Sequence, residues 1–519
     1  MDLNNIKRNQ LDYILTDMLP TELSERFTFF YFYEFLMTKR KELKQMNNFL
    51  ISVKNKYKTG IMFEGGGSGH GGHKGNNWVT MPLKYSIMKE LHTEREISLL
   101  QPIAAVELFA FVSTYQKELI NLLDMNSIFS LRHHHKNNEL CYKNKNKSIT
   151  KYFAVESAQI DKDLIEKTGM FFDIKPYKSI ASFTSSEEWL VLNSKYRYFI
   201  RTDYKACFDS IYTHTFKWLI GKDVNDTKDF KNTNIYTTID RILQNINART
   251  SNGIVVGPEF SRMIAEILLQ AIDRTVYSKL LNSGKTVGEN YNVYRFVDDI
   301  FIFAESEELA NEIVQIYSEI SAKYLLRLNE GKLYKNTVPF VLDEWINETS
   351  IFANRTSACL FRTKEEQEIW LQKEKQNSPE KEVVPHILKS RALYYSKRSI
   401  MNQLNEIICE YPSKDRTIVA YFLGTILNKV SRNKENVKIF SEHVTEQTVA
   451  NFMDLIFYAY SFFPNYNNTQ RFLSIVSYIR DEYDIFTSSE QLQKLVNKYA
   501  FIFDKANLND IINLVLFCA

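Results

Sequence analysis

Residues 294–303 read Tyr-Arg-Phe-Val-Asp-Asp-Ile-Phe-Ile-Phe, so two adjacent carboxylates stand between two short apolar runs. Runs of this length, rich in β-branched and aromatic side chains, are typical of β-strands. The stretch therefore predicts a tight hairpin with Asp298 and Asp299 at its tip. Asp also favours ordinary exposed turns, because it hydrogen-bonds its own backbone. Clustered carboxylates have a second use, since they hold pairs of divalent metals about 3.5–4 Å apart. Residues elsewhere in the chain distinguish an exposed turn from a metal site.

A third carboxylate, Asp203, follows another strand-like run at residues 198–202. An acid at a strand end suits a two-metal site, because Mg²⁺ takes oxygen ligands in octahedral geometry and keeps several waters or phosphates. Between the acids, residues 253–261 read Gly-Ile-Val-Val-Gly-Pro-Glu-Phe-Ser and lead into a run with helical spacing. Gly257 and its neighbours predict a loop where the backbone approaches a flat ligand such as a base pair.

Lys332 closes the segment Leu-Asn-Glu-Gly-Lys at residues 328–332, after a run with helical spacing at residues 310–325. One hypothesis is that its ammonium faces a triphosphate and neutralises the departing pyrophosphate. The alternative is a solvated surface charge, which is the usual state of a lysine after a helix.

In order and spacing, these segments resemble the palm of reverse transcriptases over roughly residues 80–345. Asp203 stands at the first-motif acid, and Asp298 and Asp299 stand in the aromatic-x-Asp-Asp motif. The resemblance implies that Asp203 and Asp298 ligate both metal ions and that Asp299 supports the site less directly. The implied ions are two Mg²⁺, which Mn²⁺ can replace. It also implies that Lys332 belongs to the lysine-bearing motif that follows.

Phe208 stands five residues after Asp203, where the resemblance implies an aromatic gate against a ribose 2′-hydroxyl. Such a gate selects dNTPs over NTPs, whereas ordinary core packing is the alternative in a chain with 36 Phe. Val255 and Val256 depart from the family pattern, which commonly has Pro and Gln there. Phe296 likewise replaces the commoner Tyr. The missing Gln puts ordinary template handling in doubt, but neither departure removes a metal ligand.

Arg132 ends the segment Ile-Phe-Ser-Leu-Arg, which resembles the start of the fingers in reverse transcriptases of bacterial abortive-infection and defence systems. The resemblance makes Arg132 a candidate for holding an incoming triphosphate or the template backbone. Three consecutive histidines, His133–His135, follow it and suggest a metal. Adjacent residues do not point at one ion without strain, and no Cys has zinc-finger spacing. The sequence therefore argues against a structural metal there.

The whole chain has 519 residues, enough for two or three domains with sizeable cores. Its 44% of hydrophobic and 14% of aromatic residues indicate a globular protein. The net charge of only +3 means that any nucleic-acid surface must be local. Five dispersed Cys, no signal peptide and no run of membrane-spanning length predict a cytoplasmic protein with no membrane partner.

Composition divides the chain into five segments. Residues 1–63 predict an N-terminal helical region. Residues 64–77 hold seven of the 16 glycines and predict a flexible loop, whether native or an engineered linker. Residues 78–361 correspond to fingers and palm, residues 362–384 to a charged linker, and residues 385–519 to an α-helical domain. The predicted fold class is α+β, a right-hand polymerase with fingers and palm and an all-α C-terminal helical domain.

The resemblance implies an RNA-directed DNA polymerase of a bacterial antiphage defence system. Its implied partners are dNTPs, RNA in the form of a dedicated non-coding RNA, and a DNA product, with homo-oligomer assembly as a further expectation. One alternative is template-independent or protein-primed DNA synthesis, which the missing Gln at Val256 favours. Another is a catalytically silent RNA-binding scaffold. The three retained acids argue against a scaffold, because buried unpaired carboxylates are costly to keep without metals.

Overall fold

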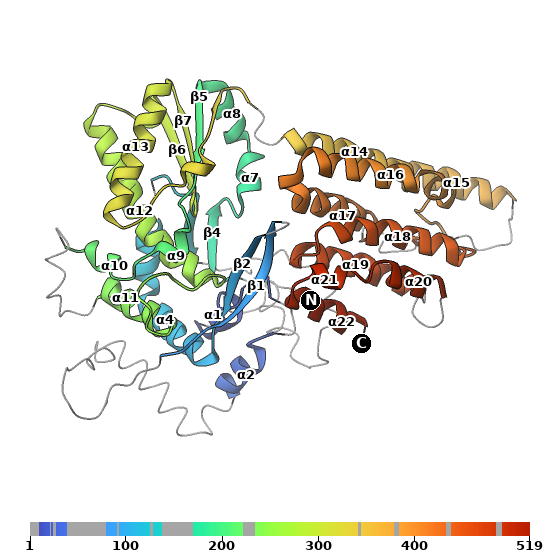
Figure 1. The fold of residues 1–519 in the computed structure, drawn as a ribbon, viewed down its shortest axis with the longest axis horizontal. Coiled ribbons are helices and arrows are strands. Elements are labelled where there is room, and N and C mark those ends of the chain that lie inside the picture. The colour runs from blue at the N-terminus through green and yellow to red at the C-terminus, as the bar shows by residue number, and fades with distance from the viewer. Residues whose placement is uncertain are drawn as a thin grey trace.

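The chain folds around two large hydrophobic cores and a smaller third one, and Figure 1 shows the two halves that result. The first core joins residues between Leu11 and Leu326, and the second joins residues between Phe352 and Phe517. This computed structural model describes residues 10–20, 22–23, 27–38, 79–90, 93–124, 128–136, 170–221, 234–340, 344–377, 384–431, 437–483 and 490–518.

A four-stranded antiparallel sheet, with strand order β6-β7-β5-β8, lies at the centre of the first half. Its strands are β5 (Tyr198–Thr202), β6 (Tyr291–Phe296), β7 (Asp299–Ala304) and β8 (Tyr334–Thr337). Alternate residues of β5 and β7 enter different cores. They are Ile200, Ile300 and Ile302 in the first core and Phe199, Phe301 and Phe303 in the third. Because both faces of β5 and β7 are largely buried, the carboxylates near these strands lie at their ends.

Helices cover both faces of this sheet (Figure 1). They are α12 (Glu259–Asn282) and α13 (Glu307–Lys323) over the isoleucine face, and α7 (Ile180–Thr184) and α8 (Glu187–Lys195) over the phenylalanine face. The hydroxyls of Ser306 and Ser186 accept a backbone N–H at the start of α13 and α8, and glutamates fill the first turn of each helix. These are favourable N-terminal signals, because they satisfy free N–H groups and complement the helix dipole.

Two small antiparallel sheets and several helices complete this half. The strands are β1 (Leu83–Glu90) with β2 (Thr93–Leu99), and β3 (Arg132–Lys136) with β4 (Phe172–Pro176). The helices are η2 (Gln10–Asp12), α1 (Tyr13–Thr16), α2 (Phe30–Thr38), α4 (Pro102–Asp124), α9 (Cys207–Ser210), α10 (Thr215–Trp218), α11 (Ile235–Asn245) and η5 (Glu330–Lys332). Tyr13 packs edge-on against Phe171, with ring centroids 5.2 Å apart. The described part of residues 1–63 thus shares the first core.

Helices make up the regular structure of the C-terminal half, as predicted, and two isolated β-bridges join its loops among the described residues. The helices are α14 (Glu344–Leu360), α15 (Lys364–Asn377), α16 (Ser390–Glu410), η6 (Pro412–Lys414), α17 (Asp415–Ser431), α18 (Glu446–Phe462), α19 (Tyr466–Glu482), α20 (Glu490–Lys498), α21 (Ile502–Lys505) and α22 (Leu508–Cys518). Phe352 and Leu360 of α14 belong to the second core, so the helical half begins before the expected linker at 362–384.

Part of that expected linker is α15, and its residues 378–383 lie outside the described residues. The glycine-rich stretch 64–77 also lies outside them. Among the helices that the structure describes, none has both the length and the apolar character required to cross a lipid bilayer.

Candidate active site

The hairpin predicted at residues 294–303 is formed by β6 and β7, and Phe296 and Asp299 are its last paired residues. Val297 and Asp298 make the turn. Val297 has a φ of +56°, which is unfavourable for a β-branched residue. Arg295 holds this turn, because its Nη1 donates a hydrogen bond of 2.8 Å to the Val297 carbonyl.

The three predicted acids lie around one cavity of about 810 Å³. Asp203 directly follows β5, and Thr202 pairs with Ile300 of β7, so strand pairing brings Asp203 beside the hairpin tip. Asp203, Asp298 and Asp299 all line this cavity. Sheet topology thus collects carboxylates that are about a hundred residues apart in the sequence.

Each acid has a different electrostatic environment. Burial, followed by the charges of Asp299 and Asp203, raises the pKa of Asp298 to about 6. Asp299 accepts hydrogen bonds from Arg201, of 2.9 Å from Nη2 and 3.2 Å from Nε. Asp203 Oδ2 accepts a 2.7 Å hydrogen bond from Lys332 Nζ, and this bond raises the pKa of Lys332.

The acid cluster has the properties of a site for divalent metals. Its donors are carboxylate oxygens, which suit hard cations such as Mg²⁺. Asp203 Oδ1 is buried and has no hydrogen-bond partner among the described residues. The raised pKa of Asp298 reflects burial and like charges held together, and a bound cation relieves such repulsion.

Phe208 and the loop after Asn252 form another wall of the cavity. The Ile254 N–H donates to the Phe208 carbonyl at 2.9 Å, which ties the loop to the segment after Asp203. Gly253 has a φ of +81°, and a Cβ there would lie 3.2 Å from the Asp209 carbonyl oxygen. Gly253 is therefore the glycine that the cavity wall requires.

Gly257 has a different role from the one expected, because it does not line this cavity. Its φ is +127°, and a Cβ there would lie 2.8 Å from Pro20 Cγ and 2.9 Å from Ile97 Cγ2. Packing of the N-terminal region and β2 against the loop accounts for this glycine. The expectation that Gly257 contacts substrate is corrected accordingly.

Arg132 is likewise displaced from its expected role. The residue is only 5% exposed, its guanidinium forms an ion pair with Glu259 at the start of α12, and it lies over the Phe296 ring at 5.3 Å. It does not line the cavity of the acids. A buried, paired guanidinium is not available to a triphosphate, so this expectation is also corrected.

Cations from the β1–β2 hairpin line the cavity instead. They are Lys84, Lys89 and Arg95. They were not among the residues predicted from the sequence, although the charged residues in two short strand-like runs were a usable signal. Arg201 was missed as well, and its place one residue before the end of β5 was the corresponding signal.

Arg295 is a further residue of the site region that was not predicted from the sequence. It is fully buried and pairs with two acids of α12, at 2.7 Å to Glu266 Oε1 and 2.7 Å to Asp273 Oδ2. Buried and half-buried residues alternate along β6, and Arg295 falls on the buried face. A charge at a core-facing strand position, with two acids seven residues apart on a helix, was a readable sign of this cluster.

A second cavity, of about 600 Å³, lies between the sheet and the helical half. Arg201, Asp203, Asp299 and Lys332 line it from the sheet side. From the helical half its lining includes Trp345, Tyr411, Ser413 and Lys414.

Comparison with known proteins adds a family match. Residues 136–350 match the family described as reverse transcriptase (RNA-dependent DNA polymerase). No curated protein matches the chain. Similar solved structures include apo telomerase from Candida tropicalis truncated from its C-terminal domain, at 15% identity and a TM-score of 0.24, over 32% of this chain and 36% of that one.

Two further telomerase structures are similar over more of the chain. Telomerase from Candida albicans, in complex with a TWJ fragment of telomeric RNA, has 11% identity and a TM-score of 0.28, over 82% of this chain and 65% of that one. Apo telomerase from Candida tropicalis has 10% identity and a TM-score of 0.31, over 87% of this chain and 74% of that one. These TM-scores are low, so the structural likenesses carry no argument, and the family match covers residues 136–350 only. That match and the described fold confirm the predicted polymerase architecture.

Proposed function

We propose that this chain, an RNA-directed DNA polymerase whose reverse transcriptase domain spans residues 136–350, joins dNTPs by a two-metal mechanism with Mg²⁺ held by Asp203 and Asp298. Asp299 supports these ligands and is itself held by Arg201. When bound, the metals lower the pKa of the attacking hydroxyl and stabilise the leaving oxygen. The observation that carries the proposal is the meeting of all three acids at one cavity.

The other residues of the cavity act on the nucleotide. Lys332 keeps its proton, because the hydrogen bond to Asp203 raises its pKa, so it is suited to neutralise the pyrophosphate as it departs. Phe208 lies in the cavity wall, where a bulky ring excludes a 2′-hydroxyl. Lys84 and Arg95 supply positive charge for phosphates of the nucleotide or the template.

The template in this proposal is RNA, and specifically a dedicated non-coding RNA copied into DNA for antiphage defence in the bacterial cytoplasm. Support for the defence role is the resemblance of residues 128–132 to defence-associated reverse transcriptases. A plaque assay with wild type and Asp298→Asn tests it directly. Equal plating of phage on both strains contradicts the defence role while leaving the polymerase proposal intact.

The polymerase proposal is tested by sequencing the nucleic acid that co-purifies with the protein. The comparison is between wild type, Asp298→Asn and the surface control Glu319→Gln on α13. We expect DNA with wild type and with the control, and none with Asp298→Asn. DNA complementary to a bound RNA supports templated copying, and a homopolymer supports untemplated synthesis. Identical nucleic acid in all three samples supports the RNA-binding scaffold.

Protein-primed synthesis is a second candidate, because Tyr411 and Tyr334 line the smaller cavity together with Asp203 and Lys332. In that case a tyrosine hydroxyl replaces the 3′-hydroxyl as the nucleophile, and the first nucleotide becomes linked to the protein. The test is incubation with labelled dNTP followed by denaturing electrophoresis. Label that stays on wild type and is lost with Tyr411→Phe or Tyr334→Phe supports this candidate, and unlabelled protein contradicts it.

A further inference from the structure

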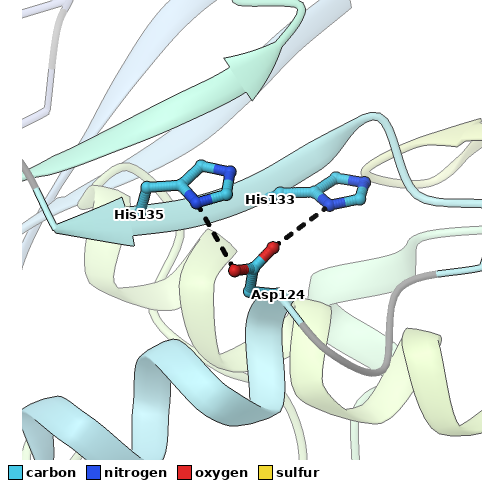
Figure 2. Close-up of side chains that lie close together, drawn as sticks. All are labelled: Asp124, His133 and His135. Carbon is cyan, nitrogen blue, oxygen red and sulfur yellow. Dashed lines mark ion pairs between the residues drawn. The ribbon is translucent and has the colours of Figure 1, made fainter.

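His133 and His135 project from the same face of β3, as Figure 2 shows. Alternate residues of a strand share a face, so residues two apart converge where adjacent ones do not. The two imidazole rings are stacked, with centroids 6.3 Å apart and planes inclined by 14°. His134 lies on the opposite, buried face. His134 therefore points away from any ion that its neighbours bind. His133 and His135 can both face one ion, because they are two residues apart on the strand.

The Asp124 carboxylate, at the end of α4, lies between the two rings (Figure 2). Its Oδ1 lies 3.7 Å from His133 Nδ1, and its Oδ2 lies 3.5 Å from His135 Nδ1. These separations exceed the 2.7–3.2 Å of ordinary N–H···O hydrogen bonds. One potential ligand atom from each residue lies within 4.8 Å of the others.

The spacing of these atoms is compatible with a tetrahedral ion. Zn²⁺ binds imidazole nitrogen at about 2.0–2.1 Å and carboxylate oxygen at about 2.0–2.2 Å, so neighbouring ligand atoms lie roughly 3.4 Å apart. The observed 3.5 and 3.7 Å lie close to that value, and each joins a ring nitrogen to a different oxygen of the Asp124 carboxylate. A rotation of this carboxylate that presents one oxygen to both rings would complete the set. The three side chains are only partly buried, at 26%, 36% and 39% exposure, so an ion and a water reach them.

A backbone group already orients one of the ligands. His133 Nε2 lies 2.8 Å from the Ser130 carbonyl, so a neutral ring donates its proton there and directs the Nδ1 lone pair toward Asp124. Ligating histidines commonly have such a carbonyl partner, which fixes their tautomer. The C-terminal end of α4 carries negative partial charge, so the carboxylate at Asp124 adds to a potential that favours a cation.

We propose that Asp124, His133 and His135 bind one first-row transition metal ion of the kind that prefers imidazole, such as Zn²⁺, with a coordination position open to water. Two nitrogen donors distinguish this site from the all-carboxylate cluster at Asp203 and Asp298, which suits Mg²⁺. The metal would pin α4 to β3. Residues 129–131, just before β3, pair with Arg295 in β6 of the β6–β7 hairpin, so the metal would also stabilise the segment that contacts this hairpin.

The test is calorimetric titration of the metal-stripped full chain with Zn²⁺ in millimolar Mg²⁺, which occupies the carboxylate cluster. We expect wild type to bind one equivalent with a raised melting temperature. His133→Ala/His135→Ala should lose that equivalent, with affinity lower by at least ~100-fold, because two of three ligands are removed. His70→Ala/His73→Ala is the matched control, since it removes two histidines elsewhere in the chain and should bind as wild type does.

Asp124→Asn keeps the shape of the site, so it tests the proposal even if His133→Ala/His135→Ala fails to fold. We expect this variant to bind Zn²⁺ with an affinity lower by roughly 10–100-fold. Co²⁺ gives a second reading, because a tetrahedral site with nitrogen donors produces visible absorption that the carboxylate cluster does not. Absence of Zn²⁺ binding by wild type overturns the proposal, and so does undiminished binding by His133→Ala/His135→Ala.

Discussion

Replacing Arg295 with Met removes the only positive charge within hydrogen-bonding distance of Asp273 in the described part of the chain. It also removes two hydrogen bonds to Glu266, of 2.7 and 3.0 Å, and the 2.8 Å bond that holds the Val297 carbonyl at the hairpin turn. Although burial opposes ionisation, Arg295 holds the pKa of Glu266 below its ordinary value, so Glu266 is charged when paired. Met fills similar space and supplies no donor.

The expected cost of Arg295→Met follows from these contacts. Two carboxylates and one carbonyl lose a donor, at about 1–3 kcal/mol each, which gives roughly 3–9 kcal/mol. Breaking a buried ion pair from one side costs about 3–5 kcal/mol. We therefore expect a loss of about 4 kcal/mol in the free energy of unfolding of the first core. Polymerase activity should fall as well, because the turn carrying Asp298 loses its support.

Urea unfolding, followed by hydrogen exchange of peptides covering β6 and β7, measures this loss locally. Local measurement is needed because a chain with two cores need not unfold in one step. Lys279→Met is the matched control. Its ion pair with Glu319 is about half exposed on both sides, so we expect a cost of only about 1 kcal/mol or less. The triple variant Arg295→Met/Glu266→Gln/Asp273→Asn should recover at least half of the loss. A loss below about 1 kcal/mol for Arg295→Met, or no recovery in the triple variant, refutes the reasoning.

Three other changes have distinct expected outcomes. Gly257→Ala should lower the free energy of unfolding by about 1–3 kcal/mol through backbone strain and overlap, and Gly284→Ala, where nothing lies within 4 Å, should cost less in the same thermal melts. Phe208→Ala should reduce the ratio of kcat/KM for dNTP over NTP by at least ~10-fold, and an unchanged ratio contradicts the gate. Burial raises the pKa of Asp510 to about 7, so as pH rises the unfolded chain loses this proton first and wild type loses stability up to about pH 7. The difference in the free energy of unfolding between Asp510→Asn and wild type should therefore grow by about 2–3 kcal/mol in favour of the variant between about pH 5 and pH 8, at ~1.4 kcal/mol per pKa unit. Urea unfolding at the two pH values measures it.

The acids were predictable because the signal for each is local. A short apolar run followed by Asp marks a strand end. Antiparallel pairing of β5 with β7 then brings Asp203 beside the hairpin that carries the other two acids. The helical half was predictable for a similar reason, since its apolar period is repeated along each helix. Its first helix, α14, was assigned elsewhere because the partners that complete its packing, α16 and α17, come later in the chain.

The misplaced residues depend on contacts that are distant in the sequence. Gly257 is explained by Pro20 and Ile97, and Arg132 by Glu259. No local pattern identifies such partners, so both residues were predicted to contact the substrate on the basis of the motifs in which they stand. The histidines show the reverse case, because β3 was not expected, and without strand alternation the convergence of His133 and His135 was not foreseen.

The two cavities share a wall formed by Arg201, Asp203, Asp299 and Lys332, so space lies on both sides of these side chains. A pocket with a single mouth suits an enzyme that releases a small product after every turnover. A polymerase has to admit monomers while a lengthening strand leaves, and these two flows interfere if they use one opening. In a polymerase of the proposed kind, the space on both sides of these carboxylates would let monomers enter from one cavity while the product strand leaves through the other.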